Sequence, residues 1–143
     1  MSATLTREEA ERAVAAWALT QLDVPWVHQA RVPGKGMDCV GLLVLGGRLH
    51  GFEIVDMLEY GLIVSPEQLQ QYMHMNCEPV EEPVPGGLAS FWFRQPISPV
   101  HVGVMLDARR FVHSYRRAGK VVENSLDKVW GRRVHKFWRY KWA

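Results

Sequence analysis

The stretch Met37-Asp38-Cys39-Val40-Gly41-Leu42-Leu43 opens an apolar run that continues to Leu45. Residues 23–37, immediately before it, hold two prolines and two glycines and are predicted to form a loop. The Gly46-Gly47 pair is the predicted end of the run. Periodicity does not distinguish helix from strand in so short a segment. If the run is a helix, Cys39 lies at its N-terminus, where the helix macrodipole lowers the pKa of a thiol.

The flanking segments predict helices first and strands afterwards. Thr6 and Glu9 form a capping box for an amphipathic helix over residues 7–22, and Ser65-Pro66-Glu67-Gln68 starts another helix. Residues 78–87 are predicted to form an exposed loop between the two halves. The predicted strands are Leu88–Phe93, Val100–Leu106 and Phe111–Tyr115, with Val121–Glu123 and Val134–Trp142 as further candidates. This order indicates an α+β fold.

Composition is that of one globular domain spanning residues 1–143, with 48% hydrophobic and 22% charged residues. A net charge of +2 does not indicate nucleic acid as a partner. Six tryptophans near basic residues raise an RNA-binding alternative, which no nucleic-acid motif supports. We expect no signal peptide and no membrane span, and therefore synthesis in a cytoplasm with Cys39 and Cys77 reduced. We expect no metal and no cofactor.

A cysteine nucleophile needs a base within hydrogen-bond reach and a third group that orients the base. Of the six histidines, His101 begins one predicted strand and His113 lies in the next. A three-residue loop at residues 106–108 would place the two histidines directly opposite, with Cβ atoms ~5 Å apart. A two-residue loop at residues 108–109 would put them on opposite faces of the sheet.

These segments resemble one family in residue type, order and spacing. Met37–Leu43 resembles the Asp-Cys-Ser-Gly-Leu-Val motif of NlpC/P60 cysteine peptidases. His101-Val102-Gly103-Val104-Met105-Leu106 is similar to the family's His-Val-Gly-Ile-Tyr-Leu segment, and Phe111-Val112-His113-Ser114 to the segment after it. Pro85–Phe91 resembles the Pro-Gly-Asp-Leu strand. The resemblance covers residues 5–140, nearly the whole chain.

The resemblance implies a papain-like NlpC/P60 fold, in which the nucleophile helix packs on an antiparallel β-sheet. It implies hydrolysis of amide bonds in peptidoglycan stem peptides, often the D-γ-glutamyl–diaminopimelate bond. Cys39 would be the nucleophile and His101 its base, with His113 orienting that base in a Cys-His-His triad. Trp26 would be a wall of the substrate pocket, and Asp38 would help to receive a free amino terminus of the substrate.

Two departures from the family pattern bear on the substrate and the source. Val40 stands where the family usually has a serine that helps Asp38 to receive the amino terminus. Pro25-Trp26-Val27-His28-Gln29 resembles the bacteriophage branch of the family, encoded near tail genes. A phage tail protein that acts at the cell wall, with other tail proteins as partners, is therefore expected. The alternatives are a structural tail-assembly protein with this fold and no turnover, or a thiol amidase or acyltransferase with another substrate.

Overall fold

The computed structural model describes residues 4–57, 59–94 and 98–142 and has the expected α+β architecture. Its helices are α1 (Arg7–Thr20), α2 (Cys39–Arg48) and α3 (Pro66–Asn76), with a 3₁₀ turn η1 at Gly131–Arg133. A small hairpin, β1 (Arg31–Val32) and β2 (Gly36–Met37), interrupts the predicted loop before Cys39. The main sheet contains β3 (Cys77–Val80), β4 (Leu88–Phe91), β5 (His101–Met105), β6 (Arg110–Tyr115), β7 (Lys120–Ser125) and β8 (Val134–Tyr140).

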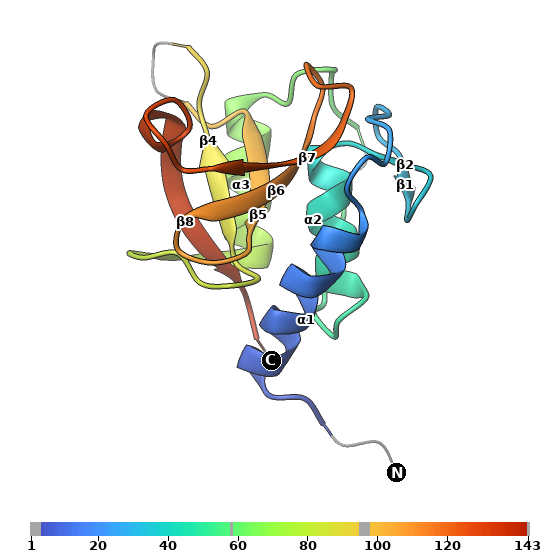
Figure 1. Ribbon diagram of the computed structural model, residues 1–143, viewed down its shortest axis with the longest axis vertical. Helices are drawn as coiled ribbons and strands as arrows, with labels where there is room; N and C mark the ends of the chain where they lie inside the picture. Colours follow the sequence, from blue (N-terminus) through green and yellow to red (C-terminus); the bar gives the residue numbers. More distant parts are fainter. Residues whose placement is uncertain (1–3, 58, 95–97, 143) are drawn as a thin grey trace.

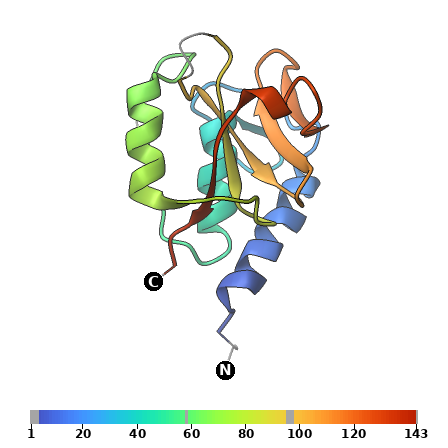
Figure 2. The same cartoon turned by 90° about the vertical axis from the view of Figure 1, so that its left-hand side faces the viewer.

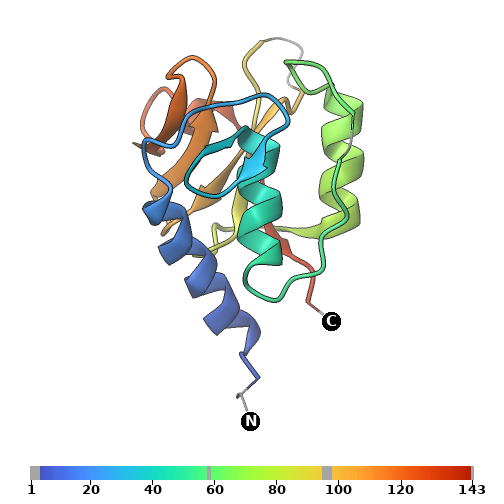
Figure 3. The same ribbon diagram turned by 90° about the vertical axis from the view of Figure 1, so that its right-hand side faces the viewer.

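The six strands of the main sheet are antiparallel to their neighbours, in the order β3-β8-β4-β5-β6-β7. Helix α2 lies against β5 and β6. In Figure 3 this helix stands in front of the sheet, with α1 on one side and α3 on the other. Figure 2 shows the same arrangement from the opposite side, with strands in front of α2. Helix α2, which begins at Cys39, therefore packs on the antiparallel sheet, as expected (Figure 1).

Capping side chains set the starts of the helices. The Thr6 hydroxyl accepts the Glu9 N–H, and the Glu9 carboxylate accepts the Thr6 N–H, which completes the predicted capping box. The Ser65 hydroxyl likewise accepts the Gln68 N–H at the start of α3. Both helix starts were predictable because a cap is encoded within four consecutive residues.

The Gly46-Gly47 pair does not end α2, contrary to the prediction, because the helix continues to Arg48. Both glycines are buried and lie where the helix approaches other elements closely. A Cβ at residue 46 would lie 3.2 Å from the Tyr140 hydroxyl, and one at residue 47 would lie 2.7 Å from the Ile54 side chain. These glycines therefore serve helix packing, and their small size holds α2 against β8.

The predicted loop at residues 78–87 is wrong over its first part, since Cys77–Val80 forms β3 and pairs with β8. Its last part makes close contacts with α1 and β8. Gly86 has a φ of +78°, and a Cβ there would lie 1.7 Å from the Glu11 carbonyl oxygen. A Cβ on Gly87 would lie 2.6 Å from the Trp138 carbonyl oxygen. The Pro85-Gly86-Gly87 turn is thus needed to bring β4 beside both elements.

The two faces of the sheet bury different side chains. Val102, Val104 and Val112 belong to the main core, which the sheet shares with α1, α2 and α3. Met105 and Phe111 point to the other face and join a second cluster with Ala89, Phe91 and Trp130. Since side chains alternate along a strand, His101 and His113 share this second face. No helix in the described part of the chain is long and apolar enough to cross a membrane.

Candidate active site

Cys39 is the first residue of α2, directly after the N-cap residue Asp38. The Asp38 carboxylate accepts the Gly41 N–H at 2.8 Å and so caps the helix. The Cys39 side chain is 8% exposed and lines a cleft of about 860 Å³. This geometry confirms a helix after Cys39, which the apolar pattern alone did not decide.

Asp38 is buried and accepts four hydrogen bonds, two on each carboxylate oxygen. The Gly41 N–H and the Arg31 guanidinium bind Oδ1 at 2.8 and 3.0 Å. The Gln29 N–H and the Tyr60 hydroxyl bind Oδ2 at 2.7 and 2.6 Å. Arg31 also binds Asp56, so one guanidinium joins the loop before Cys39 to the segment that carries Tyr60.

The surroundings of Val40 and Gly41 explain why these two residues follow Cys39. A Cβ on residue 41 would lie 2.4 Å from the Ala30 carbonyl oxygen and 3.1 Å from Arg31 Nη1. Only glycine therefore lets the preceding loop approach α2 closely enough for Arg31 to reach Asp38. Val40 is fully buried in the main core and does not line the cleft.

His101 and His113 come together across β5 and β6, with the imidazole centroids 5.0 Å apart. The strands pair Val104 with Val112 and Met105 with Phe111, so the connecting loop covers residues 107–109. The loop has three residues, as one alternative required, but it lies one residue later than predicted. The histidines are therefore diagonal neighbours on one face rather than directly opposite. A Cβ on Gly103 would lie 3.2 Å from the His113 Cβ, so this glycine makes room for His113.

A chain of hydrogen bonds links His101, His113 and Asn124. His101 Nε2 lies 2.7 Å from His113 Nδ1, and His113 Nε2 lies 2.8 Å from Asn124 Oδ1 on β7. An amide oxygen only accepts, so His113 carries its proton on Nε2 and accepts the His101 Nε2–H at Nδ1. This tautomer leaves a lone pair on Nδ1 of His101, which is the atom that can take a proton.

Aromatic rings enclose both imidazoles and remove them from water. Ring centroids of Phe111, Trp130 and Tyr115 lie 4.6, 4.8 and 5.1 Å from that of His113. Burial lowers the pKa of His113 to about 4. Burial, followed by the charge of His113, lowers the pKa of His101 well below its ordinary value. Both histidines are therefore neutral at neutral pH, as a base must be.

The pKa of Cys39 differs from the prediction that the helix terminus lowers it. Burial and the charge of Asp38 raise the pKa of the Cys39 thiol to about 12, against hydrogen bonds with the backbone of Val102 and Val40. In the resting protein the thiol and the imidazole of His101 are thus both neutral. The backbone contact also places Cys39 beside the start of β5, one residue from His101.

The cleft brings together most of the predicted site residues. Trp26, Asp38, Cys39 and His101 line it, whereas His113 lies behind His101 at 0% exposure. Tyr60 and Tyr115 also line it, together with the arginines Arg94, Arg116, Arg117 and Arg133. Trp130 and Trp138 are buried, so neither offers a face for the base stacking of the RNA-binding alternative.

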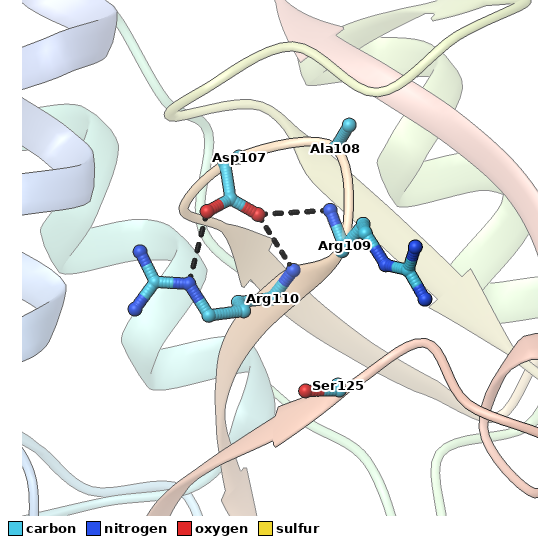
Figure 4. A pocket seen from close by; sticks show the side chains of 5 residues that line it. All are labelled: Asp107, Ala108, Arg109, Arg110 and Ser125. Carbon is cyan, nitrogen blue, oxygen red and sulfur yellow. Dashed lines mark hydrogen bonds and ion pairs between the residues drawn. The ribbon is translucent and has the colours of Figure 1, made fainter.

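A separate shallow depression lies at the turn between β5 and β6, away from Cys39 (Figure 4). The Asp107 carboxylate there accepts the backbone N–H groups of Arg109 and Arg110 and the Arg110 guanidinium. These local bonds satisfy Asp107 and lower the pKa of its carboxyl to about 2. The depression therefore lies over the turn of the hairpin that carries the histidines, and the hydrogen bonds of Asp107 are made within this turn.

Three side chains that contact the candidate site residues were not predicted from the sequence: Arg31, Asn124 and Trp130. Arg31 neutralises Asp38, Asn124 orients His113, and Trp130 shields both imidazoles. Each reaches the site from a segment without a local motif. Only the pairing of β6 with β7, which sets His113 opposite Val122, brings Asn124 within reach of it.

Comparison with known proteins identifies the fold through structure alone. No family model matches the chain, and no curated protein matches it. Solved structures do match. NlpC1 from Trichomonas vaginalis is 19% identical with a TM-score of 0.67, over 98% of this chain and 46% of that one. The NlpC/p60 domain of the peptidoglycan hydrolase SagA is 20% identical with a TM-score of 0.61, over 90% and 97%.

The peptidoglycan hydrolase RipB from Mycobacterium tuberculosis is 19% identical with a TM-score of 0.62, over 95% of this chain and 67% of that one. The chain spans about half the length of NlpC1 and almost all of the SagA domain. The helices, the sheet order and these similarities together show that the chain has the fold of the NlpC/P60 domains.

Proposed function

We propose that this chain is a cysteine peptidase that hydrolyses amide bonds in peptidoglycan stem peptides, with Cys39, His101 and His113 as its triad. One observation carries the proposal. Cys39, at the start of α2, opens into the same cleft as His101, and His101 Nε2 is hydrogen-bonded to His113. The fold supports it further, because SagA and RipB are both peptidoglycan hydrolases.

The reaction begins from a neutral thiol and a neutral imidazole. Nδ1 of His101 takes the Cys39 proton as the sulfur attacks the substrate carbonyl carbon, and the resulting imidazolium keeps its Nε2–H bond to His113. The imidazolium then protonates the leaving nitrogen, and the C–N bond breaks to give a thioester on Cys39. His101 next deprotonates a water molecule, which attacks the thioester and releases a carboxylic acid and the free thiol.

Helix α2 supplies part of the stabilisation of the oxyanion. The first N–H groups of a helix have no partner within it, and at this terminus they are directed toward the end where Cys39 lies. The Asp38 carboxylate accepts the Gly41 N–H of this turn, and the Asp38 carbonyl oxygen accepts the Leu42 N–H. The negative charge that develops on the carbonyl oxygen is therefore formed next to the first N–H groups of α2 and the positive end of the helix dipole.

For the bond that is cut, we propose the D-γ-glutamyl–diaminopimelate type, with Trp26 as a wall of the cleft. For delivery, we propose a phage tail, with other tail proteins as partners and the cell wall as the place of action. The segment Pro25-Trp26-Val27-His28-Gln29, which resembles the phage branch of the family, supports this delivery. Purification of phage particles tests the delivery. The protein should co-purify with tailed particles and should be absent from particles that lack a tail.

Digestion of purified peptidoglycan tests the proposed reaction. Wild-type protein should release new amino groups and shortened stem peptides. Mass spectrometry of the soluble fragments then identifies the bond that was cut. Cys39→Ala and His101→Ala should release none above background, while Cys77→Ala should match wild type. Unchanged peptidoglycan after prolonged incubation with wild type would favour the structural tail protein, and activity in Cys39→Ala would refute the nucleophile.

A further inference from the structure

The cleft beside Cys39 concentrates positive charge in a chain whose net charge is only +2. Four arginines line it: Arg94, Arg116, Arg117 and Arg133. The carboxylates that line it are Glu67 and Asp38, and Asp38 is already paired with Arg31. Among the described residues, none of the four cleft arginines forms an ion pair with a carboxylate. Among the described residues that line the cleft, the guanidinium charges therefore outnumber the carboxylates available to balance them.

Aromatic rings hold two of these arginines in position. The Arg116 guanidinium lies 5.7 Å from the centroid of the Trp26 ring. That of Arg133 lies 5.5 Å from Phe93 and 5.4 Å from Trp130. A guanidinium held over a ring keeps its N–H edge available and loses less freedom when it binds an anion. Trp26 and Phe93 therefore present cations to the cleft as well as forming its wall.

Asp38 is poorly suited to receive a substrate amino group. All four of its hydrogen bonds come from within the protein, and Arg31 cancels its charge at 3.0 Å. A substrate ammonium would have to displace one of these donors and would meet the positive charge of Arg31. Val40, where a serine could assist, is buried in the core. Asp38 acts instead as the cap of α2 and the anchor of the preceding loop.

We propose that the four arginines form a carboxylate subsite, and that the cleft selects an acidic peptide segment with a blocked amino end. This inference rests on the proposed function, since it specifies the substrate of the same site. Carboxylates suit a guanidinium fork because both oxygens can accept parallel N–H bonds. Leu62, Ile63 and Pro66 also line the cleft, and Leu62 and Ile63 are 53% and 70% exposed. A cleft that combines apolar side chains with cations fits a peptide with aliphatic and carboxylate groups better than a polyphosphate.

Binding to the inactive Cys39→Ala protein tests the subsite without requiring turnover. The probe is a fluorescent L-Ala-γ-D-Glu-diaminopimelate peptide with an acetylated amino end, followed by anisotropy. Amidation of its carboxylates should weaken binding at least tenfold, whereas freeing the amino end should not strengthen it. Arg116→Ala/Arg117→Ala should weaken binding about tenfold and reduce its salt dependence. The control Arg12→Ala/Arg109→Ala removes the same charge from exposed positions outside the cleft and should bind as the parent does.

The inference is overturned if the amidated peptide binds equally well, if the free amine binds at least tenfold tighter, or if both arginine pairs weaken binding alike. Tighter binding of a glycerol phosphate oligomer than of the peptide would also overturn it, by assigning the subsite to phosphate. Failure of wild type to cleave peptidoglycan would refute the proposed function and leave peptide binding by Cys39→Ala unaffected. Cleavage that is insensitive to Arg116→Ala/Arg117→Ala would refute the subsite alone.

Discussion

At the scale of single residues, the site depends on a proton position that Asn124 sets. Its Oδ1 accepts from His113 Nε2, which makes His113 Nδ1 an acceptor for His101. A protonated His113 would present an N–H to the N–H of His101 and break the chain. The low pKa of His113, about 4, keeps it neutral and therefore an acceptor.

Replacing Asn124 should separate orientation of the base from folding. We expect Asn124→Ala to lower kcat about tenfold with little change in KM, because the tautomer is no longer fixed. Asn124→Asp restores the acceptor, but its charge favours the imidazolium form of His113. The activity of Asn124→Asp should match that of wild type at pH 8. As the pH decreases, its activity should begin to fall at a higher pH than the activity of wild type does. Profiles of kcat against pH check this, and identical profiles for both variants and wild type would contradict it.

The candidate residues themselves were predictable because they lie in short local motifs. Cys39, His101 and His113 each stand in a short segment, of seven, six and four residues respectively, that resembles a segment of one family. Their surroundings were not predictable to the same degree. The Cys39 pKa was expected to fall and rises to about 12, because burial and Asp38 outweigh the helix terminus. Burial depends on the whole fold and is not encoded beside the cysteine.

At the scale of elements, the capped helices and the later strands follow the predicted bounds closely, whereas glycines were harder to interpret. Gly46 and Gly47 look like a helix end in sequence, yet they lie inside α2 against Tyr140 and Ile54. The strand β3 was missed because its partner, β8, lies more than fifty residues later. Contacts between distant segments decided each of these cases, and local patterns do not contain them.

The turn before β4 offers a matched test of close packing. Gly86 and Gly119 both have positive φ, at +78° and +76°, but an added Cβ would meet another backbone only at Gly86. Gly119→Ala should cost about 1 kcal/mol of unfolding free energy, for the backbone conformation alone. Gly86→Ala should cost about 3 kcal/mol or more, because the methyl group also meets the Glu11 carbonyl. Denaturant unfolding measures both, and equal losses would mean that α1 and this turn are not in contact as described.

At the scale of the whole molecule, the buried histidines link stability to pH. The pKa of His113 is about 4 in the folded protein, below its ordinary value of 6.5, so the unfolded chain binds this proton more readily. The contribution of the neutral His113 to the unfolding free energy is complete above pH 6.5 and is lost as the pH falls toward 4. The expected loss from His113 is ~3 kcal/mol of unfolding free energy. His101 adds a loss of the same sign, since burial lowers its pKa as well.

Urea unfolding at pH 7 and at pH 4 measures this loss. His113→Gln should be less stable at pH 7 but should lose less stability between the two pH values than wild type does. His74→Gln, at an exposed position on α3, should show the wild-type loss. If His113→Gln lost as much stability as wild type over this range, the imidazole of His113 would not be buried and neutral in the folded protein.

The central claim is that Cys39 and His101 act as a nucleophile and its base, and alkylation by a limiting amount of iodoacetamide tests it most directly. Mass spectrometry of the native protein resolves Cys39 from Cys77, which is 1% exposed and serves as an internal reference. Near neutral pH, Cys39 should be labelled faster than Cys77, and His101→Ala should slow its labelling about tenfold or more while His74→Ala leaves it unchanged. Equal labelling rates of Cys39 in wild type and His101→Ala would contradict the account.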